Sequence, residues 1–365
     1  MSKTKKVAHL NASRKFVVSS KPDSKPPVVL PKDWLVHSVD LHLRGLIDSI
    51  RINTAYCQLG MAALRQWFLA ALSGARVTGL IIGVSGTGKT KLLEMFAALF
   101  PPYRDENGLK HRVVIVNVPS EPTPISLLEA MLLALGDPRP ASGTRSAKTR
   151  RVINAIVAQG VLMLILDDLQ RFVDRNSDLV LYSASECLKE ILSNTGISIV
   201  CAGLPEARLV VDANEQLKRH FTSPVNIPRF NWSDEESRTA FVALLRAFQK
   251  RLSMFEIPKL TGSEMALRVY LGTGGLIDFI AKILKQIVWD AMDRGSRKVT
   301  LKDMETAWSR ALWDAEKLGE NPFSENFEVR KDTEQKIEAA KKINQRVERP
   351  IGKRHRKSAL KLIGL

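Results

Sequence analysis

The chain has 365 residues, of which 45% are hydrophobic, and a formal net charge of +17. This length allows one large domain or two smaller ones with a sizeable core. No apolar run is long enough to cross a membrane, and the basic N-terminus lacks the apolar segment of a secretory signal. Cys57, Cys187 and Cys201 show no paired spacing, so we expect thiols in a reducing compartment. The composition favours a cytoplasmic protein and argues against membrane or exported classes.

The positive charge is concentrated at the two ends of the chain. Residues 1–33 carry +6 and residues 331–365 carry +7, which leaves +4 for the 297 residues between them. The first segment is rich in Lys, Ser and Pro and lacks periodic apolar residues, so we expect it to be disordered. Basic tails favour DNA or an acidic partner surface; solubilising tails without a specific partner are the alternative.

The first structural signals lead into a glycine-rich loop. Apolar residues at three- and four-residue spacing predict amphipathic helices at residues 40–50 and 61–72. A short apolar run at residues 80–82 predicts a buried strand. Helical spacing resumes over residues 91–99. The intervening sequence GVSGTGKT therefore has the strand and helix that a phosphate-binding P-loop requires.

A P-loop binds phosphates through consecutive backbone N–H groups and the positive end of the following helix. We expect Lys89 to reach the β- and γ-phosphates and the Thr90 hydroxyl to bind Mg²⁺. A glycine turn that contains Lys-Thr by chance is the alternative. The pattern favours a site for ATP and Mg²⁺, whose expected nucleotide contacts are Gly83, Val84, Ser85, Gly86, Thr87, Gly88, Lys89, Thr90 and Lys91.

Strands and helices alternate after this loop. We expect a polar turn region at residues 101–111 and a basic loop at 137–151. Strands that are apolar throughout argue for a parallel sheet covered on both faces, and hence for an α/β fold. The strands are predicted at residues 112–118, 161–168 and 197–202, and the helices at 125–135, 152–158 and 185–192.

The strand at residues 161–168 ends in two carboxylates, Asp167 and Asp168. Downstream of a P-loop, such a pair is typical of the Walker B motif. Asp167 would hold Mg²⁺ through water, and Asp168 would polarise the attacking water. A solvated strand end is the alternative. Many such ATPases have Glu at the second position, and the shorter Asp predicts slow hydrolysis.

The position of the acidic pair also restricts the class of ATPase. The strand at residues 112–118 lies between the P-loop and the acidic pair in sequence. This indicates the branch of P-loop ATPases whose two motif strands are not neighbours, rather than small GTPases. Gln170, Arg171 and Arg175 follow the pair, and they either face a DNA channel or form a solvated helix face.

The residues from Trp232 onward show helical patterns only. Helices are predicted over residues 234–252, 263–271, 276–292 and 301–312. A helical bundle after an α/β core is typical of an AAA+ lid. We expect Trp289, Trp308 and Trp313 to pack within it. Domain boundaries are placed at 34–230 for the core, 231–315 for the lid and 316–365 for a basic tail.

Three later motifs carry a family resemblance: GLPEA at residues 203–207, NEQLKRHF at 214–221 and IPRF at 227–230. They resemble the TniB/TnsC family of AAA+ ATPases, which regulate DNA transposition, and the similarity extends over roughly residues 40–310. The resemblance implies ATP-driven assembly of subunits on double-stranded DNA as a ring or filament. It implies a nucleoid-associated bacterial protein that links a TniQ-type target-selection protein to the transposase.

The resemblance also implies roles for individual residues. Arg219 would act as an arginine finger on the triphosphate of a neighbouring subunit, with His220 at the aligned position as the alternative. DNA contacts are implied by approximate position at Thr123, Arg145, Lys148 and Arg175. Leu204 stands where a polar sensor residue is usual, and residues 274–278 carry no sensor arginine. These departures favour an ATP-gated switch with slow turnover over a motor.

Two rival functions remain open from the sequence. One is a replication-type loader that resembles origin-recognition or helicase-loader ATPases; it predicts a DNA-reading winged helix after the lid. The other is a scaffold that binds nucleotide without hydrolysing it. ATP turnover with and without duplex DNA separates the second alternative from the leading hypothesis.

Overall fold

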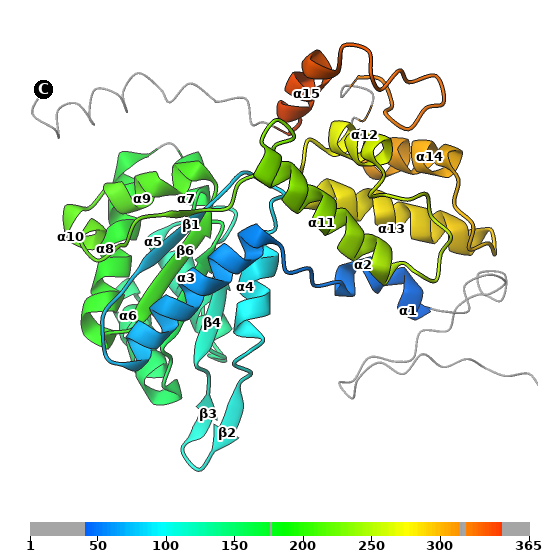
Figure 1. Cartoon of the computed structure of the whole chain (residues 1–365). Coiled ribbons are helices and arrows are strands. Elements are labelled where there is room, and N and C mark those ends of the chain that lie inside the picture. Colours follow the sequence, from blue (N-terminus) through cyan, green and yellow to red (C-terminus); the bar gives the residue numbers. More distant parts are fainter. Residues whose placement is uncertain (1–40, 176, 314, 316–318, 345–365) are drawn as a thin grey trace, which may run out of the picture.

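A computed structural model describes residues 41–175, 177–313, 315 and 319–344, and these residues form an α/β unit beside a helical unit (Figure 1). The N-terminal segment 1–33, for which disorder is predicted, and residues 345–365 of the predicted basic tail lie outside the described residues.

The α/β unit is built on a five-stranded parallel sheet in the order β4-β5-β6-β1-β7. The P-loop strand β1 and the acidic strand β5 are not neighbours, as expected, because β6 pairs with both. The strand that was predicted at residues 112–118 is β4, and it lies at an edge of the sheet. The strands are β1 Gly79–Ile82, β4 Val113–Asn117, β5 Met163–Asp167, β6 Ser198–Gly203 and β7 Val225–Asn226.

Helices cover both faces of this sheet because successive strand residues point to opposite sides. Ile81 and Ile165 pack in one apolar cluster with α3 and α4, whereas Leu80 and Leu164 pack in another with α5, α6 and α8. The expected doubly covered sheet is therefore confirmed. The helices are α3 Ala55–Leu72, α4 Lys89–Ala97, α5 Pro124–Ala134, α6 Arg145–Gln159, α7 Arg171–Asp174, α8 Asp178–Thr195, α9 Arg208–Asp212 and α10 Glu215–Lys218, with a 3₁₀ turn at Pro205–Ala207.

Two segments of this unit differ from the prediction. Residues 101–111 are not a plain turn region, because β2 Tyr103–Asp105 and β3 Gly108–Lys110 form an antiparallel hairpin. The basic loop is shorter than expected, since α6 begins at Arg145, where the Thr144 side chain accepts a hydrogen bond from the Ala147 N–H. This cap starts the helix two turns before the apolar spacing becomes visible in the sequence.

The helical unit is built around the long helices α11 to α14, and the two short helices that open the described chain pack on them. Ile47 of α2 lies in the same apolar core as the long helices, and Trp289 Nε1 on α13 donates to the Arg44 carbonyl. Residues 41–49 thus precede the α/β unit in sequence but pack on the helical unit. These elements are α1 Leu41–Arg44, α2 Leu46–Ser49, α11 Glu235–Arg251, α12 Ser263–Thr273, α13 Ile277–Asp293 and α14 Leu301–Ala311.

The three lid tryptophans do not all behave as predicted. Trp308 is buried, and its Nε1 donates to the Gly272 carbonyl at 2.8 Å. Trp289 packs against the same core. Trp313 is 93% exposed, so the expectation that it packs within the bundle is wrong.

Residues 319–344, expected within a basic tail, instead pack on the helical unit. Phe323 is fully buried in its core, and Ile337 of α15 Thr333–Lys341 joins the same cluster. The buried guanidinium of Arg268 on α12 holds this segment, because it donates to the carbonyls of Pro322 at 2.6 Å and Ser324 at 3.0 Å. This segment therefore forms part of the folded unit.

Replacing Arg268 by Ala should release residues 319–344 from the helical unit. The substitution leaves buried carbonyls without donors, at a cost of about 1–3 kcal/mol each. Amide hydrogen exchange of this segment should accelerate strongly. Arg310→Ala is the control, because Arg310 makes an exposed pair with Asp290, and such pairs contribute at most about 1 kcal/mol. Equal exchange in the two variants would contradict this role for Arg268.

The helix lengths and the cysteines can be compared with the expectations from the sequence. No helix in the described part of the chain is long and apolar enough to span a membrane. Cys187 and Cys201 are free, fully buried thiols, and burial raises the pKa of each to about 12. They are packing residues, as expected.

Candidate nucleotide site

The phosphate-binding loop joins β1 to α4 through backbone that requires glycine. Gly86 and Gly88 have φ values of 84° and 92°, in the left-handed region. A Cβ on Gly83 would lie 2.2 Å from the Ile227 carbonyl oxygen, so this position is closed to larger residues. The nine-residue helix α4 begins at Lys89, directly after the loop. The first N–H groups of α4 therefore face the loop, as in an anion site.

Lys89 lies buried beneath this loop. Its Nζ donates to the carbonyls of Gly83 at 2.7 Å and Val84 at 3.0 Å. Burial lowers the pKa of Lys89, while the nearby carboxylates of Asp167 and Asp168 raise it. A triphosphate would add negative charge at this point and would favour the charged ammonium. The loop thus joins a strand to a helix, as the sequence predicts. Contact of Lys89 with the phosphates stays a prediction.

Thr90 and Asp167 connect the P-loop helix to the acidic strand across β6. The Thr90 hydroxyl donates to Asp167 Oδ2 at 2.6 Å. Burial raises the pKa of Asp167, and the Thr90 hydrogen bond opposes this shift. Paired hydroxyl and carboxylate oxygens are ligands that suit Mg²⁺, whose remaining positions are usually filled by phosphate and water. No cluster of three or more His, Cys, Asp or Glu metal ligands occurs in the described residues.

Asp168 is held by two side chains that follow it in sequence. Its backbone is left-handed, with φ 61°. Gln170 Nε2 donates to Oδ1 at 3.0 Å, and Arg171 Nη2 donates to Oδ2 at 2.7 Å. Arg171 also donates to the Val118 carbonyl. The sequence allowed two interpretations of Gln170 and Arg171, namely a DNA channel or a solvated helix face. In the structure both side chains contact Asp168 of the acidic pair.

The helical unit contacts the P-loop directly. The Asp278 N–H, at the start of α13, donates to the Gly86 carbonyl at 3.1 Å. A Cβ on Gly86 would lie 3.3 Å from the Asp278 Cβ. Asp278 also pairs with Lys282 at 2.8 Å. The sequence showed only that no arginine occupies this turn, and it gave no signal for the contact with the loop.

Arg219 lies at the other end of the sheet from the P-loop. It follows α10 and is exposed. The neighbouring His220 carbonyl accepts from the N–H of Thr78, which precedes β1, whereas the P-loop begins after β1 at Gly83. Five extended residues span about 16 Å. Within one subunit, Arg219 is therefore not brought together with Lys89, Thr90, Asp167 and Asp168.

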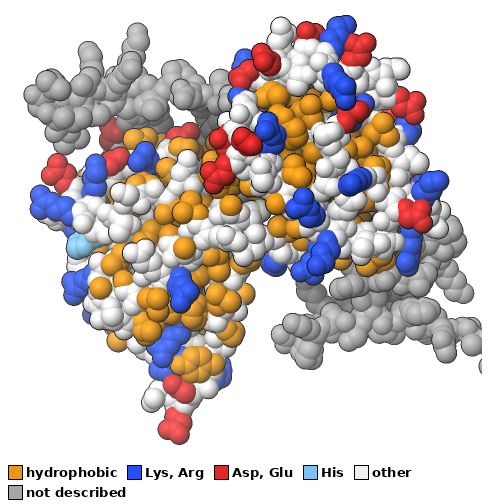
Figure 2. Space-filling model, in the orientation of Figure 1, with side chains coloured by type: hydrophobic (Ala, Val, Ile, Leu, Met, Phe, Trp, Pro, Cys, Tyr) orange, Lys and Arg blue, Asp and Glu red, His pale blue; other side chains and the backbone are white. Residues whose placement is uncertain are grey.

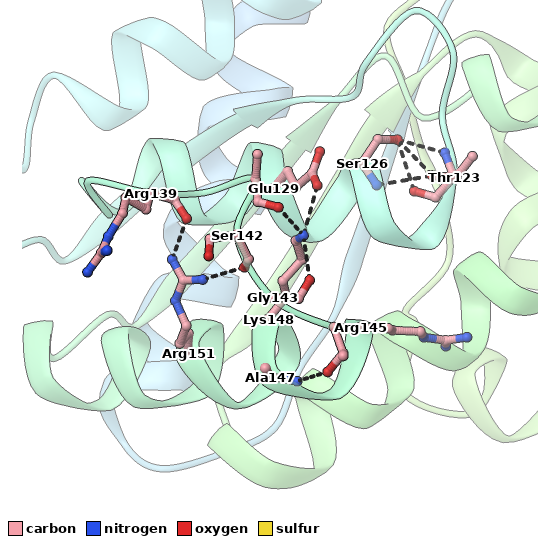
Figure 3. A network of polar contacts seen from close by, with 12 residues as sticks. Thr123, Ser126, Glu129, Arg139, Ser142, Gly143, Arg145, Ala147, Lys148 and Arg151 are labelled. Carbon is pink, nitrogen blue, oxygen red and sulfur yellow. Dashed lines mark hydrogen bonds and ion pairs between the residues drawn. The ribbon is translucent and has the colours of Figure 1, made fainter.

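The four candidate DNA contacts have different environments. Arg145 and Arg175 are exposed, and Figure 3 shows the Arg145 side chain pointing away from the surrounding polar network. Thr123 is half-buried and caps α5, where it accepts from the Ser126 N–H at 3.0 Å. This helix begins at Pro124, one residue before the predicted start at 125.

Lys148 does not fit the predicted role as a DNA contact. It is 3% exposed, and its ammonium donates to the carbonyls of Ala141 and Gly143 and pairs with Glu129 at 3.0 Å (Figure 3). These partners account for its three hydrogens. Arg151 similarly bonds the carbonyls of Arg139 and Ser142. Both cations hold the loop before α6, so in this conformation Lys148 is not available to a phosphate.

Residues 64–234 match the family described as "Bacterial TniB protein". No curated protein sequence matches. Among solved structures, Aeropyrum pernix ORC1 in complex with DNA is 17% identical, with a TM-score of 0.52, and the match covers 73% of this chain and 69% of that chain. Aeropyrum pernix ORC2 in ADPNP–ADP complexes is 15% identical, with a TM-score of 0.54 and coverage of 76% and 74%.

At these identities, the two structures establish a shared fold. They belong to the AAA+ class, in which a parallel sheet carries the P-loop and a helical region follows. The same arrangement is present here. Residues 64–234 thus resemble the TniB family, and the described part of the chain shares the fold of the two ORC structures.

Proposed function

We propose that the protein is an ATP-dependent, DNA-binding regulator of transposition. The observation that carries the proposal is the 2.6 Å contact between Thr90 and Asp167, which joins the P-loop to the acidic strand within a TniB-family segment. The loop residues and Lys89 would hold ATP, and Thr90 and Asp167 would hold Mg²⁺, which would supply positive charge to the phosphates. Asp168 orients the attacking water.

The proposal includes assembly of several copies. Arg219 lies beside the start of β1, and the P-loop begins at the other end of that strand, about 16 Å along the chain; in the proposed assembly Arg219 completes the site of a neighbour. Head-to-tail assembly requires two different surfaces that fit each other. Large exposed apolar side chains occur on α3, at Leu59, Leu69 and Leu72, and separately at the start of α8, at Leu179 and Tyr182. We assign these two surfaces to the subunit interface.

Duplex DNA is the proposed scaffold for this assembly. The ORC1 structure with a similar fold is a DNA complex. Lys and Arg side chains are scattered singly over the face in Figure 2, an arrangement that suits contacts spread along a phosphate backbone rather than one deep base-reading site. Within the assembly, the protein would link a TniQ-type target-selection protein to the transposase, and hydrolysis would dismantle it.

Charge reversal at Arg145 should weaken DNA binding without unfolding the protein. Arg145→Glu removes one exposed phosphate contact and adds a repulsive charge, so affinity for random duplex DNA should fall about tenfold and the salt slope should decrease by about one. Lys148→Met should lower stability instead, because it removes the partner of Glu129. Fluorescence anisotropy at several salt concentrations measures the DNA affinity and the salt slope of each variant. Thermal unfolding measures their stability. Equal loss of DNA affinity in the two variants would contradict these assignments.

A replication-type initiator is the second candidate, because the similar structures are ORC proteins. That function predicts a winged helix after the lid. Residues 319–344 pack on the helical unit and do not themselves form such a domain. Competition between random and origin-like duplexes separates the two functions: transposition regulation predicts sequence-tolerant binding.

A further inference from the structure

The end of β6 lies beside the acidic pair but supplies no polar side chain to it. β6 ends at Gly203, and the next residue is Leu204. The Gly83 N–H, at the start of the P-loop, donates to the Gly203 carbonyl at 3.2 Å. The end of β6 is therefore in contact with the phosphate loop. Gly203 and Leu204 nevertheless provide no polar side chain to the Asp168 carboxylate.

The side chain of Gln170 fills this place. Gln170 is 8% exposed, and its Oε1 accepts the Leu204 N–H at 3.0 Å. A Cβ on Gly203 would lie 2.3 Å from the same Oε1. Because Gly203 has no side chain, the end of β6 leaves room for the carboxamide of Gln170, which follows β5.

The hydrogen bonds fix the orientation of this carboxamide. An N–H group requires an acceptor, so Oε1 must face Leu204, and Nε2 must then face the carboxylate of Asp168, which it contacts at 3.0 Å. A flipped amide would place two donors together at Leu204 and two acceptors together at Asp168. Gln170 therefore connects the end of β6 to one oxygen of Asp168 in a single orientation.

We infer that Gln170 is a positioning residue for ATP hydrolysis, which sets the orientation of the Asp168 carboxylate relative to β6 and the P-loop. This inference rests on the proposed ATPase function. Asp168 itself would contact the attacking water, and Gln170 would act through Asp168. Arg171 holds the other oxygen of Asp168, but its guanidinium is about one-third exposed and the pair is weaker. Gln170, which is buried and is itself fixed by the Leu204 N–H, is the constraint that ties this carboxylate to β6.

Two substitutions of Gln170 test this role. Gln170→Met keeps the volume but removes both hydrogen bonds, and Gln170→Ala removes the side chain. Misorientation of a catalytic group costs up to about 100-fold in rate, so turnover should fall about 10- to 100-fold in each variant. The affinity for ATP, measured by titration calorimetry, should stay within about twofold. Gln159→Ala is the matched control, because Gln159 bonds the Leu135 carbonyl and does not contact the acidic pair.

A second-site variant tests the geometry independently. Gly203→Ala should displace the Gln170 carboxamide and lower turnover to a similar degree while Gln170 is still present. The double variant Gly203→Ala with Gln170→Ala should be no slower than Gln170→Ala alone, because both changes remove the same contact and Ala at position 170 leaves room for the added Cβ. Additive losses would overturn the inference. So would wild-type turnover in Gln170→Met. Absence of ATP turnover in the unaltered protein would instead overturn the proposed ATPase function, and this inference with it.

Discussion

Replacing Asp168 by Asn is expected to lower ATP turnover by about 100-fold or more without weakening ATP binding. Asn keeps an oxygen that can accept from Gln170 Nε2, so the side chain can retain its position. It loses the negative charge that would orient and polarise water. Asp168 takes no part in the hydrogen bonds between Lys89 and the loop carbonyls, so we expect the phosphate site to stay intact.

Steady-state phosphate release and calorimetric ATP binding measure the two effects separately. Asp212→Asn serves as the control, because it neutralises an exposed carboxylate that pairs with Lys218 on the surface. Control turnover should equal that of the unaltered protein. If Asp168→Asn hydrolyses ATP at the normal rate, another group activates the water, and the assignment of the acidic pair is wrong.

Replacing Lys89 by Met should abolish ATP binding at working concentrations. Each charge-assisted hydrogen bond contributes about 1.5–3 kcal/mol, so losing two to the phosphates weakens binding by about 100-fold or more. Met fits the buried stem of Lys89, but it cannot donate to the carbonyls of Gly83 and Val84. Without ATP, ordered assembly on duplex DNA should also be lost.

Electron microscopy with duplex DNA and ATP, a slow analogue or ADP measures this loss. Lys302→Met is the control, because its exposed ammonium pairs only with Glu305 among the described groups. It should assemble normally. If Lys89→Met coats DNA as well as the unaltered protein, nucleotide and assembly are not coupled.

The sequence predicted the elements whose signals are local. The apolar runs gave β1, β4, β5 and β6, and the GxxxxGK[ST] pattern placed the P-loop between a strand and a helix. The non-adjacent order of β1 and β5 also followed, because the number of strands between the motifs restricts the topology. The hairpin of β2 and β3 was missed, since its polar, exposed residues carry no alternating pattern.

Contacts between distant residues could not be predicted. Lys148 has the composition of a DNA-binding residue, but Glu129 and two loop carbonyls use its charge inside the fold. Gln170 gave no motif signal, because its role depends on Leu204, 34 residues later. The packing of residues 319–344 depends on Arg268, which lies among ordinary helical residues.

The central claim is that one copy of the chain completes the ATP site of another. Asp168→Asn subunits bind ATP and offer an intact Arg219, whereas Arg219→Ala subunits offer an intact acidic pair. Each variant alone should be inactive. In an equal mixture, random head-to-tail pairing leaves about one quarter of the sites with both intact groups.

The decisive measurement is therefore ATP turnover of this mixture on duplex DNA, compared with each variant alone. The account predicts recovery to about one quarter of the turnover of the unaltered protein. Turnover that stays at the background of the separate variants, or an Arg219→Ala protein that is fully active by itself, would contradict it.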